Sequence, residues 1–422
     1  MEEIEDLLAF IQKSPSAFQT VAESSRRLKK AGFAELRWGA DWQLKTGGCY
    51  FAKVFDSALV AFSVGEGRRG LRIAAAHTDF PGFRVKPAAG VSKDGYGLLN
   101  VEPYGGLILQ SWLDRPLSLA GKVVLRGRDA FSPVVKLVDF ARPLITIPQL
   151  AIHMNRNVND GVKLNRQTEL MPLLTMTGEA KDKEFFDELL CAELKAERDE
   201  LLAYDLTVYD CEEGCALGAE GEFVSSPRLD NLTSVKACLD GLVSSAGDGI
   251  CMVALFDNEE VGSRTKQGAG SALLGQALEL IYRGLGRAEA ERQADVAGGF
   301  LLSCDVAHGL HPNYPGKADP TNRPRLNGGV VLKQAASQSY AGDAEAVAVV
   351  EQLCRDNGIK HQRFVNRSDI PGGSTLGSIA SALLSMRAMD VGVPVLAMHS
   401  ARELMGAADQ QALAGLVRAF FE

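Results

Sequence analysis

Four continuous apolar runs of strand length divide this chain, and they constrain its fold more than any other feature. The runs lie at residues 71–76, 250–256, 299–304 and 393–398, with helical patterns between them. Strands that are buried on both faces read as continuous apolar runs, and their alternation with helices is typical of parallel sheets. The sequence therefore predicts an α/β fold in which helices flank a mostly parallel sheet.

Helical patterns account for most of the sequence around these runs. Two helices are predicted in the first 31 residues, because Ile4, Leu7, Leu8 and Ile11 share one face and a second apolar face begins after Ser16. Further helical patterns cover residues 232–243, 269–285, 343–357 and 407–422.

The pattern of predicted secondary structure changes between residues 90 and 214. Short β-rich pieces with Gly and Pro, such as KVVLRGR and PLITIP, replace the strand and helix alternation there. Residues 181–202 are densely charged, which predicts a solvated helix. We interpret 90–214 as an inserted β-rich domain, and 1–89 and 215–422 as the two parts of the domain that it interrupts.

The composition limits which binding partners and which cellular compartment we expect for this protein. The net charge of −8 is spread along the 422 residues, and no cluster of Lys and Arg alternates with aromatic residues, so we expect no nucleic-acid partner. The acidic, amphipathic start lacks the features of a signal peptide, and no segment has about 18 uninterrupted apolar residues. We expect a cytoplasmic protein with no membrane association and with reduced cysteines.

Each apolar run is followed closely by residues that can bind a metal ion. In chain order, these residues are His77, Asp257, Glu259, Glu260, Asp305 and His399. Ligands bind in the crevice at the carboxyl ends of the strands of an open α/β sheet, so residues far apart in sequence converge there. One histidine after a strand is more often structural. Four strand ends of this kind favour a metal site, because buried carboxylates are costly unless they are paired or bind metal.

Asp230 lies just before an amphipathic helix and has two interpretations. It is placed to cap the helix, or to serve as a carboxylate shared between two metal ions. The adjacent Glu259 and Glu260 suggest a division of labour, in which one binds metal and the other accepts a proton from an attacking water. Asp79, two residues after His77, is placed to orient that histidine. A set of histidines and carboxylates suits zinc, manganese or cobalt.

Several longer blocks occur in a fixed order along nearly the whole chain. They are HTDFPGFRVKP, SPRLDNL, DNEEVGS, CDVAHGLHPNYP, GGVVLKQAASQSYA and VLAMHSARE. Together these blocks resemble the aspartyl aminopeptidase family of dizinc metallopeptidases. The resemblance implies peptide substrates with a free N-terminus, a preference for Asp or Glu as the first residue, and a β-rich dimerisation domain. It also implies a homo-oligomer in which dimers form a tetrahedral dodecamer.

The resemblance also implies roles for individual residues. The implied ligands of two zinc ions per subunit, with Asp230 shared between the ions, are His77, Asp230, Glu260, Asp305 and His399. Glu259 would be the general base, and Asp79 would touch His77 but no metal. Without the resemblance, Asp230 would be assigned as a helix cap.

The resemblance implies four substrate-binding residues that spacing alone does not single out. His308, Lys333 and Tyr340 would contact the substrate, and His153 would reach into the active site of the neighbouring subunit. Their ordinary interpretations are a loop histidine, a solvated charge, a half-buried aromatic ring and a surface histidine.

Two other functions are compatible with these residues. Another co-catalytic zinc hydrolase, such as an N-deacylase or carboxypeptidase, would use a similar ligand set. A catalytically silent assembly protein would keep the fold, but the presence of Glu259 and of all five ligands argues against it. The absence of an HExxH motif excludes the single-zinc thermolysin arrangement.

Overall fold

The computed structural model describes residues 2–67, 70–177, 184–245 and 247–422, and the chain folds into two compact units. The first unit contains Met1–Phe80, Gly214–Met398 and Glu403–Glu422. The second contains Pro81–Glu213 together with His399–Arg402. The second unit thus starts before residue 90, where the sequence placed the insert, and it includes a short segment from near the C-terminus.

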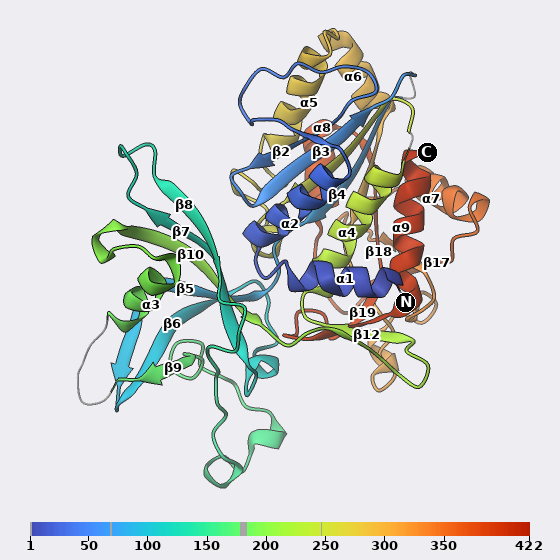
Figure 1. The fold of residues 1–422 in the computed structure, drawn as a ribbon. Coiled ribbons are helices and arrows are strands. Elements are labelled where there is room, and N and C mark those ends of the chain that lie inside the picture. Colours follow the sequence, from blue (N-terminus) through green and yellow to red (C-terminus); the bar gives the residue numbers. More distant parts are fainter. Residues whose placement is uncertain (1, 68–69, 178–183, 246) are drawn as a thin grey trace. The chain divides into compact units, whose positions relative to one another are not determined.

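A nine-stranded sheet forms the centre of the first unit (Figure 1). Its order is β1-β2-β3-β13-β4-β14-β18-β16-β17, and the neighbours β13, β4, β14 and β18 are parallel. The bounds are β1 Ala34–Glu35, β2 Cys49–Val54, β3 Ala58–Val64, β4 Leu71–His77, β13 Ile250–Phe256, β14 Phe300–Cys304, β16 Val330–Gln334, β17 His361–Val365 and β18 Arg387–Gly392. The predicted α/β class with a mostly parallel sheet is confirmed.

Helices cover both faces of this sheet, and alternate residues of β4 contribute to the two cores. Ala74 and Ala76 lie in one core with α1 (Glu2–Gln12), α2 (Ala17–Lys30), α4 (Leu229–Ser244), α7 (Ala344–Asp356) and α9 (Ala407–Phe421). Ile73 and Ala75 lie in the other core with α5 (Leu273–Gly284), α6 (Glu289–Gly298) and α8 (Leu376–Leu384). Burial of both faces explains why the central strands read as continuous apolar runs.

The two N-terminal helices, α1 and α2, agree with the sequence prediction. The helix α6 was not predicted from the sequence. The side chain of Ser16 accepts a hydrogen bond from the Phe18 backbone N–H and caps α2. In α6 the buried residue is Val296, so the helix carries little apolar periodicity. None of the described helices is both long enough and apolar enough to cross a membrane.

The fourth apolar run does not belong to the central sheet. It forms β19 (Pro394–Leu396) in a five-stranded sheet of order β11-β12-β20-β19-β15. The other members are β11 Cys215–Leu217, β12 Phe223–Ser226, β15 Ala307–His308 and β20 Glu403–Gly406. The neighbour of β14 in the central sheet is β18, which sequence reading missed because Arg387 and Asp390 interrupt its apolar residues.

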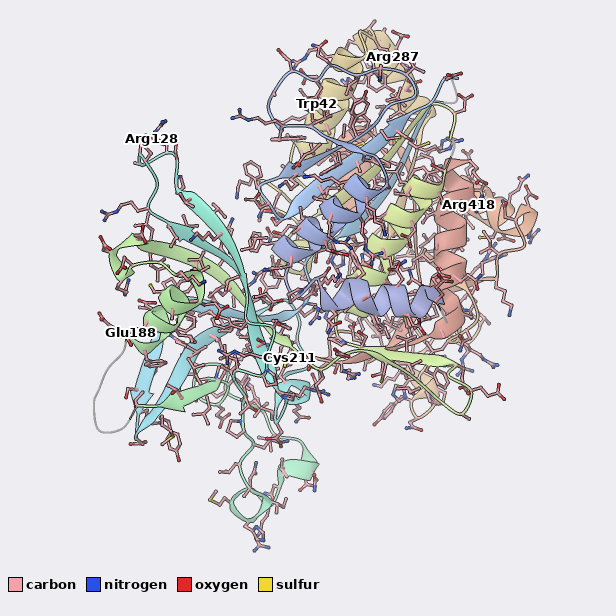
Figure 2. All side chains as sticks on the ribbon, in the orientation of Figure 1. Trp42, Arg128, Glu188, Cys211, Arg287 and Arg418 are labelled. Atoms are coloured by element: carbon pink, nitrogen blue, oxygen red, sulfur yellow. The ribbon has the colours of Figure 1, made fainter. Side chains whose placement is uncertain are left out.

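The second unit is built on an antiparallel six-stranded sheet of order β8-β7-β10-β5-β6-β9. The bounds are β5 Gly82–Lys93, β6 Tyr96–Tyr104, β7 Leu117–Leu125, β8 Val134–Asp139, β9 Leu173–Met176 and β10 Leu201–Asp210. Arg128, labelled in Figure 2, lies in the turn between β7 and β8. Short 3-10 helices in the two units are η1 Leu109–Trp112, η2 Ile152–Met154, η3 Val158–Asp160, η4 Arg198–Glu200, η5 Glu259–Val261 and η6 Pro315–Lys317.

The helix predicted over residues 181–202 is shorter than expected and is not fully solvated. The helix α3 covers Phe185–Leu194, and β10 begins at Leu201. Residues 181–183 lie outside the described part of the chain. Phe186 and Leu190 are buried in the core of the unit, whereas Glu188 is on the exposed face (Figure 2). The prediction of a solvated helix was therefore wrong for one face of α3.

Candidate metal centre

Three predicted ligands meet beyond the carboxyl ends of the central strands. His77 is the last residue of β4, and Asp305 follows β14. Nε2 of His77 lies 3.4 Å from Oδ1 of Asp230 and 3.5 Å from Oδ1 of Asp305. All three side chains are buried, with residue exposures of 1%, 3% and 8% in the order His77, Asp230 and Asp305. Two carboxylates therefore face one imidazole nitrogen in a buried site.

Asp230 occupies an irregular first turn of α4, just before the regular part of the helix. Arg228 is the capping residue, and Asp230 and Asn231 both have non-helical backbone angles. The backbone N–H of Asp230 donates to Oε2 of Glu403 at 2.9 Å, and the Asn231 side chain donates to the carbonyl of Cys304 at 2.9 Å. The second bond ties this turn to the end of β14, next to Asp305. The role of Asp230 as a metal ligand stays a prediction.

The carboxylate of Asp79 holds the turn that carries the two glutamates. Its Oδ1 and Oδ2 atoms accept the backbone N–H groups of Glu259 and Glu260, each at 3.1 Å. Nδ1 of His77 lies 3.0 Å from the Asp79 backbone carbonyl, compared with 3.5 Å from Oδ1. Asp79 therefore orients His77 mainly through its backbone, while its side chain orients η5. Asp257, by contrast, accepts hydrogen bonds from Asn258 and Gln267 within its own loop.

Glu259 and Glu260 lie close to His77. One ligand atom from each of these three residues lies within 4.8 Å of the others. Burial is the main cause that raises the pKa of Glu259, to about 8; the charge of His77 opposes the rise, and the carboxylates of Asp305, Asp79 and Asp230 add to it. A carboxyl group with a pKa near neutrality is suited to proton transfer.

The donor set fits a zinc ion. The cluster of His77, Asp230 and Asp305 offers one imidazole nitrogen and two carboxylates whose ligand atoms lie within 4.8 Å of one another. Zinc sites in proteins use these ligand types. Burial alone would lower the pKa of His77, but hydrogen bonds to Asp230, Asp305 and Asp79 raise it well above its ordinary value. The surroundings of His77 therefore favour a positive charge, which a metal cation also supplies.

His399 lies in the second unit. Its Nδ1 atom is 2.9 Å from the backbone carbonyl oxygen of Gly106, and its φ of 66° is in the left-handed region. A histidine whose Nδ1–H donates to a backbone carbonyl binds metals through Nε2. Its participation in the metal site stays a prediction.

Lys333 is fully buried beside Asp305. Its exposure is 2%, and Nζ donates to the carbonyl of Val306 at 3.0 Å and to Oδ2 of Asp305 at 3.4 Å. Burial lowers the pKa of Lys333, but the charges of Asp305 and Asp390 outweigh that effect and raise it. The interpretation of Lys333 as a solvated charge was therefore wrong. The ammonium group contacts a predicted metal ligand, which a substrate-binding role alone does not explain.

The rings of Tyr340 and His308 both lie close to the ring of Phe364. Nζ of Lys333 lies 5.3 Å from the centroid of the Tyr340 ring, and Tyr340 is 4% exposed, so it is buried and not half-buried. The Phe364 ring centroid is 6.2 Å from that of Tyr340 and 5.8 Å from that of His308. These contacts form a continuous path from Asp305 to His308.

A cavity of about 390 Å³ opens beside His308 in the first unit. Its apolar lining includes Leu310, Tyr314, Phe364, Ile370 and Leu396. The lining includes His308, three residues after Asp305, and Phe364 and Val365 of β17. Its volume is in the range of small-molecule sites.

His153 is exposed on η2 of the second unit. The structure of a single chain places no other subunit beside it, so its role in a neighbouring active site stays a prediction.

Sequence reasoning missed three residues that support the site. Glu403 and Asn231 hold the Asp230 turn, and Asp390 is a buried acid on β18. Glu403 ends the VLAMHSARE block, which was the one available signal for it. Asn231 and Asp390 look like ordinary polar residues, because their partners are distant in sequence.

Comparisons with known proteins identify the family of this chain. The model of the family described as "Aminopeptidase I zinc metalloprotease (M18)" matches residues 10–421. The "Probable M18 family aminopeptidase 2" of Clostridium acetobutylicum is 43% identical over 415 residues, which cover 97% of this chain and 96% of that protein.

Solved structures show the same fold. A chain in the cryo-EM structure of the Ape4 and Nbr1 complex has a TM-score of 0.94 and 33% identity, covering 99% of this chain and 84% of that chain. The mApe1 dodecamer of S. cerevisiae has a TM-score of 0.85 and 26% identity, covering 99% and 95%. The chain therefore belongs to the M18 family of zinc metallo-aminopeptidases.

Proposed function

We propose that this protein is a two-zinc aminopeptidase that releases N-terminal residues, with a preference for Asp and Glu. The observation that carries the proposal is the placement of His77 Nε2 between the carboxylates of Asp230 and Asp305, with Glu259 beside the same histidine. One ion would be held by His77, Asp230 and Asp305. Asp230 would be shared with a second ion, which Glu260 and His399 would hold.

Glu259 would be the general base. A bound pair of zinc ions supplies Lewis acidity, which polarises the scissile carbonyl and lowers the pKa of the attacking water. Glu259 accepts the proton of that water and returns it to the leaving amine. Asp79 holds Glu259 in place for both transfers through the backbone N–H of that residue. Lys333 supports Asp305 and places a positive charge near the site, which is suited to an acidic first side chain.

We further propose that the protein is cytoplasmic and assembles from dimers into a dodecamer. The likeness to the mApe1 dodecamer supports this assembly. In the proposed assembly the second unit mediates dimerisation, and His153 contributes to the active site of the neighbouring subunit. The exposure of His153 in a single chain is compatible with that role.

Peptide hydrolysis with and without chelator tests the proposal. The substrates are short peptides that begin with Asp, Glu, Ala, Leu or Lys, and each is matched by its N-acetylated form. We expect cleavage of the free peptides only, fastest for Asp and Glu, with loss of activity on chelation and recovery on addition of zinc.

Three results would contradict the proposal. Equal cleavage of the acetylated peptides would indicate a deacylase or another hydrolase. Release of residues from the C-terminus would indicate a carboxypeptidase. Elemental analysis that finds one zinc ion per fully active subunit would contradict the two-zinc site.

A further inference from the structure

Asp390 is a buried acid that the proposed reaction does not use. It lies on β18 with an exposure of 0%, opposite Ser303 of β14 and Lys333 of β16 in the strand register. Burial of a carboxylate is costly unless partners compensate for the lost hydration. The partners of Asp390 therefore indicate what it does.

Two loop segments are joined at Asp390. Its Oδ2 atom accepts hydrogen bonds from the backbone N–H of Ala341 and, at 2.7 Å, from the hydroxyl of Thr375. Its own backbone N–H donates to the Ala341 carbonyl at 2.9 Å. The backbone N–H of Thr375 donates to the Ser339 carbonyl at 3.1 Å, which closes the connection between the segments. Tyr340 lies between the two residues held in this way.

Helix α8 closes over the carboxylate. A Cβ atom added at Gly377, in the first turn of α8, would lie 2.7 Å from Oδ1 of Asp390 and 2.7 Å from Ser303. This distance is shorter than a van der Waals contact, so the close approach of α8 requires glycine here. The carboxylate is thereby fixed from the loop side and from the helix side.

Lys333 links the same acid to the metal centre. Lys333 and Asp390 are paired across β16 and β18, and the Lys333 ammonium contacts both Asp305 and the Tyr340 ring. Burial raises the pKa of Asp390, and the nearby ammonium of Lys333 opposes that rise, so the two buried groups interact. Asp390 thus supports Lys333 and Tyr340, two of the residues for which the resemblance implies substrate contact.

We propose that Asp390 is a positioning residue that holds Tyr340 and Lys333 in the arrangement needed to bind substrate. The inference rests on the proposed function and on the substrate contacts that the family resemblance implies for those two residues. A carboxylate is suited to the role because one oxygen accepts from both an N–H and an O–H donor and its charge is compensated by Lys333.

Substitutions at Thr375 test the inference with little change of shape. Thr375→Val removes the hydroxyl that donates to Asp390, whereas Thr375→Ser keeps it. We expect Thr375→Val to lower kcat/KM about 10-fold, mainly through a higher KM, because a hydrogen bond to a charged group is lost. Thr375→Ser should stay within about 2-fold of the wild type. Asp390→Asn should have a larger effect in the same direction.

A matched control separates positioning from general stability. Thr20 is also fully buried, and its hydroxyl donates to the Ser16 carbonyl within α2. Thr20→Val should lower the melting temperature by an amount similar to that of Thr375→Val and leave KM unchanged. Equal kinetics for Thr375→Val and Thr375→Ser, or an equal rise of KM in Thr20→Val, would overturn the proposal.

Hydrogen exchange gives a readout that does not depend on the reaction. Amide exchange of residues 335–341 should become at least about 10-fold faster in Thr375→Val and Asp390→Asn, and not in Thr20→Val, because the loop loses an anchor. Unchanged exchange in both variants would overturn the proposal even in an active enzyme. Failure of the wild type to cleave free peptides would instead refute the proposed function.

Discussion

The backbone N–H of Glu259 donates to Oδ1 of Asp79 at 3.1 Å, although 180 residues separate the two in the sequence. Asp79 follows β4, and Glu259 begins the η5 turn after β13, so the bond connects the ends of two parallel neighbours. The second oxygen of Asp79 holds Glu260 in the same way. One carboxylate thus fixes the proposed base and a proposed metal ligand together.

Asp79→Asn should impair both functions of this turn. An amide has one acceptor oxygen, so one of the two backbone N–H groups would lose its partner. We expect kcat/KM to fall about 10- to 100-fold, with weaker zinc binding, as for other residues that orient metal ligands. Steady-state kinetics and titration with a zinc chelator measure the two effects. Asp41→Asn, at an exposed position, is the control and should change neither quantity.

Glu259→Gln should separate metal binding from proton transfer. The amide cannot accept the proton of the attacking water, so kcat should fall by about 10² to 10⁴. Zinc content, measured by elemental analysis, should stay at the wild-type value because Glu259 is not a proposed ligand. Glu279→Gln on the exposed side of α5 is the matched control. Near-normal turnover of Glu259→Gln would remove this residue as the base.

Lys333→Met tests whether the buried lysine supports the metal ligand Asp305. The variant removes the ammonium group that contacts this carboxylate, so we expect a change of about 10-fold or more in zinc affinity, together with loss of the preference for acidic first residues. A pure substrate contact would alter the preference and leave zinc affinity unchanged. Lys236→Met is the control, because Lys236 is equally buried and pairs with Asp6 and Asp240.

Metal-free protein should become less stable as pH rises. The folded-state pKa values of Glu259 and His77 are both raised, so folding binds extra protons. The contribution of Glu259 to the free energy of unfolding is complete below about pH 4.5 and is lost as pH rises through about 8. The contribution of His77 to the same free energy declines above about pH 6.5. The free energy of unfolding of chelated protein should therefore fall between about pH 5 and pH 8.

Denaturation of chelated Glu259→Gln provides the comparison. Without the titrating carboxyl group, its unfolding free energy should depend less steeply on pH over the same interval. Parallel pH profiles for the two chelated proteins would show that Glu259 does not titrate with a raised pKa. Zinc should stabilise the wild type more at pH 8 than at pH 6, because the ion competes with protons for His77.

The main strands and their ligands could be predicted from sequence because the signal is local. The strands β4, β13 and β14 are apolar on both faces, and His77, Glu259 and Asp305 follow at their ends. The strand β18 was missed because Asp390 interrupts its apolar run, and the reason for that acid lies in loops elsewhere in the chain.

Other parts of the site depend on contacts that spacing does not encode. A helix cap and a metal ligand can have the same residue type at the same position, so the sequence alone does not decide between these two roles for Asp230. The burial of Lys333 and the bond from Glu403 to the Asp230 turn arise from tertiary packing. The fourth apolar run was read correctly as a strand but assigned to the wrong sheet, because strand pairing is not a local property.

The position of β4 between β13 and β14 has a consequence for synthesis on the ribosome. The chain makes His77 early, but both neighbours of its strand are translated only after residues 81–213 of the second unit. Both edges of β4 stay unpaired until β13 has emerged, and one edge stays unpaired until Cys304 has emerged, so other chains or chaperones can bind these edges and the apolar surface of β4. The metal centre can therefore form only after β14 has been translated and the strands on both sides of the insertion have paired in the folded chain.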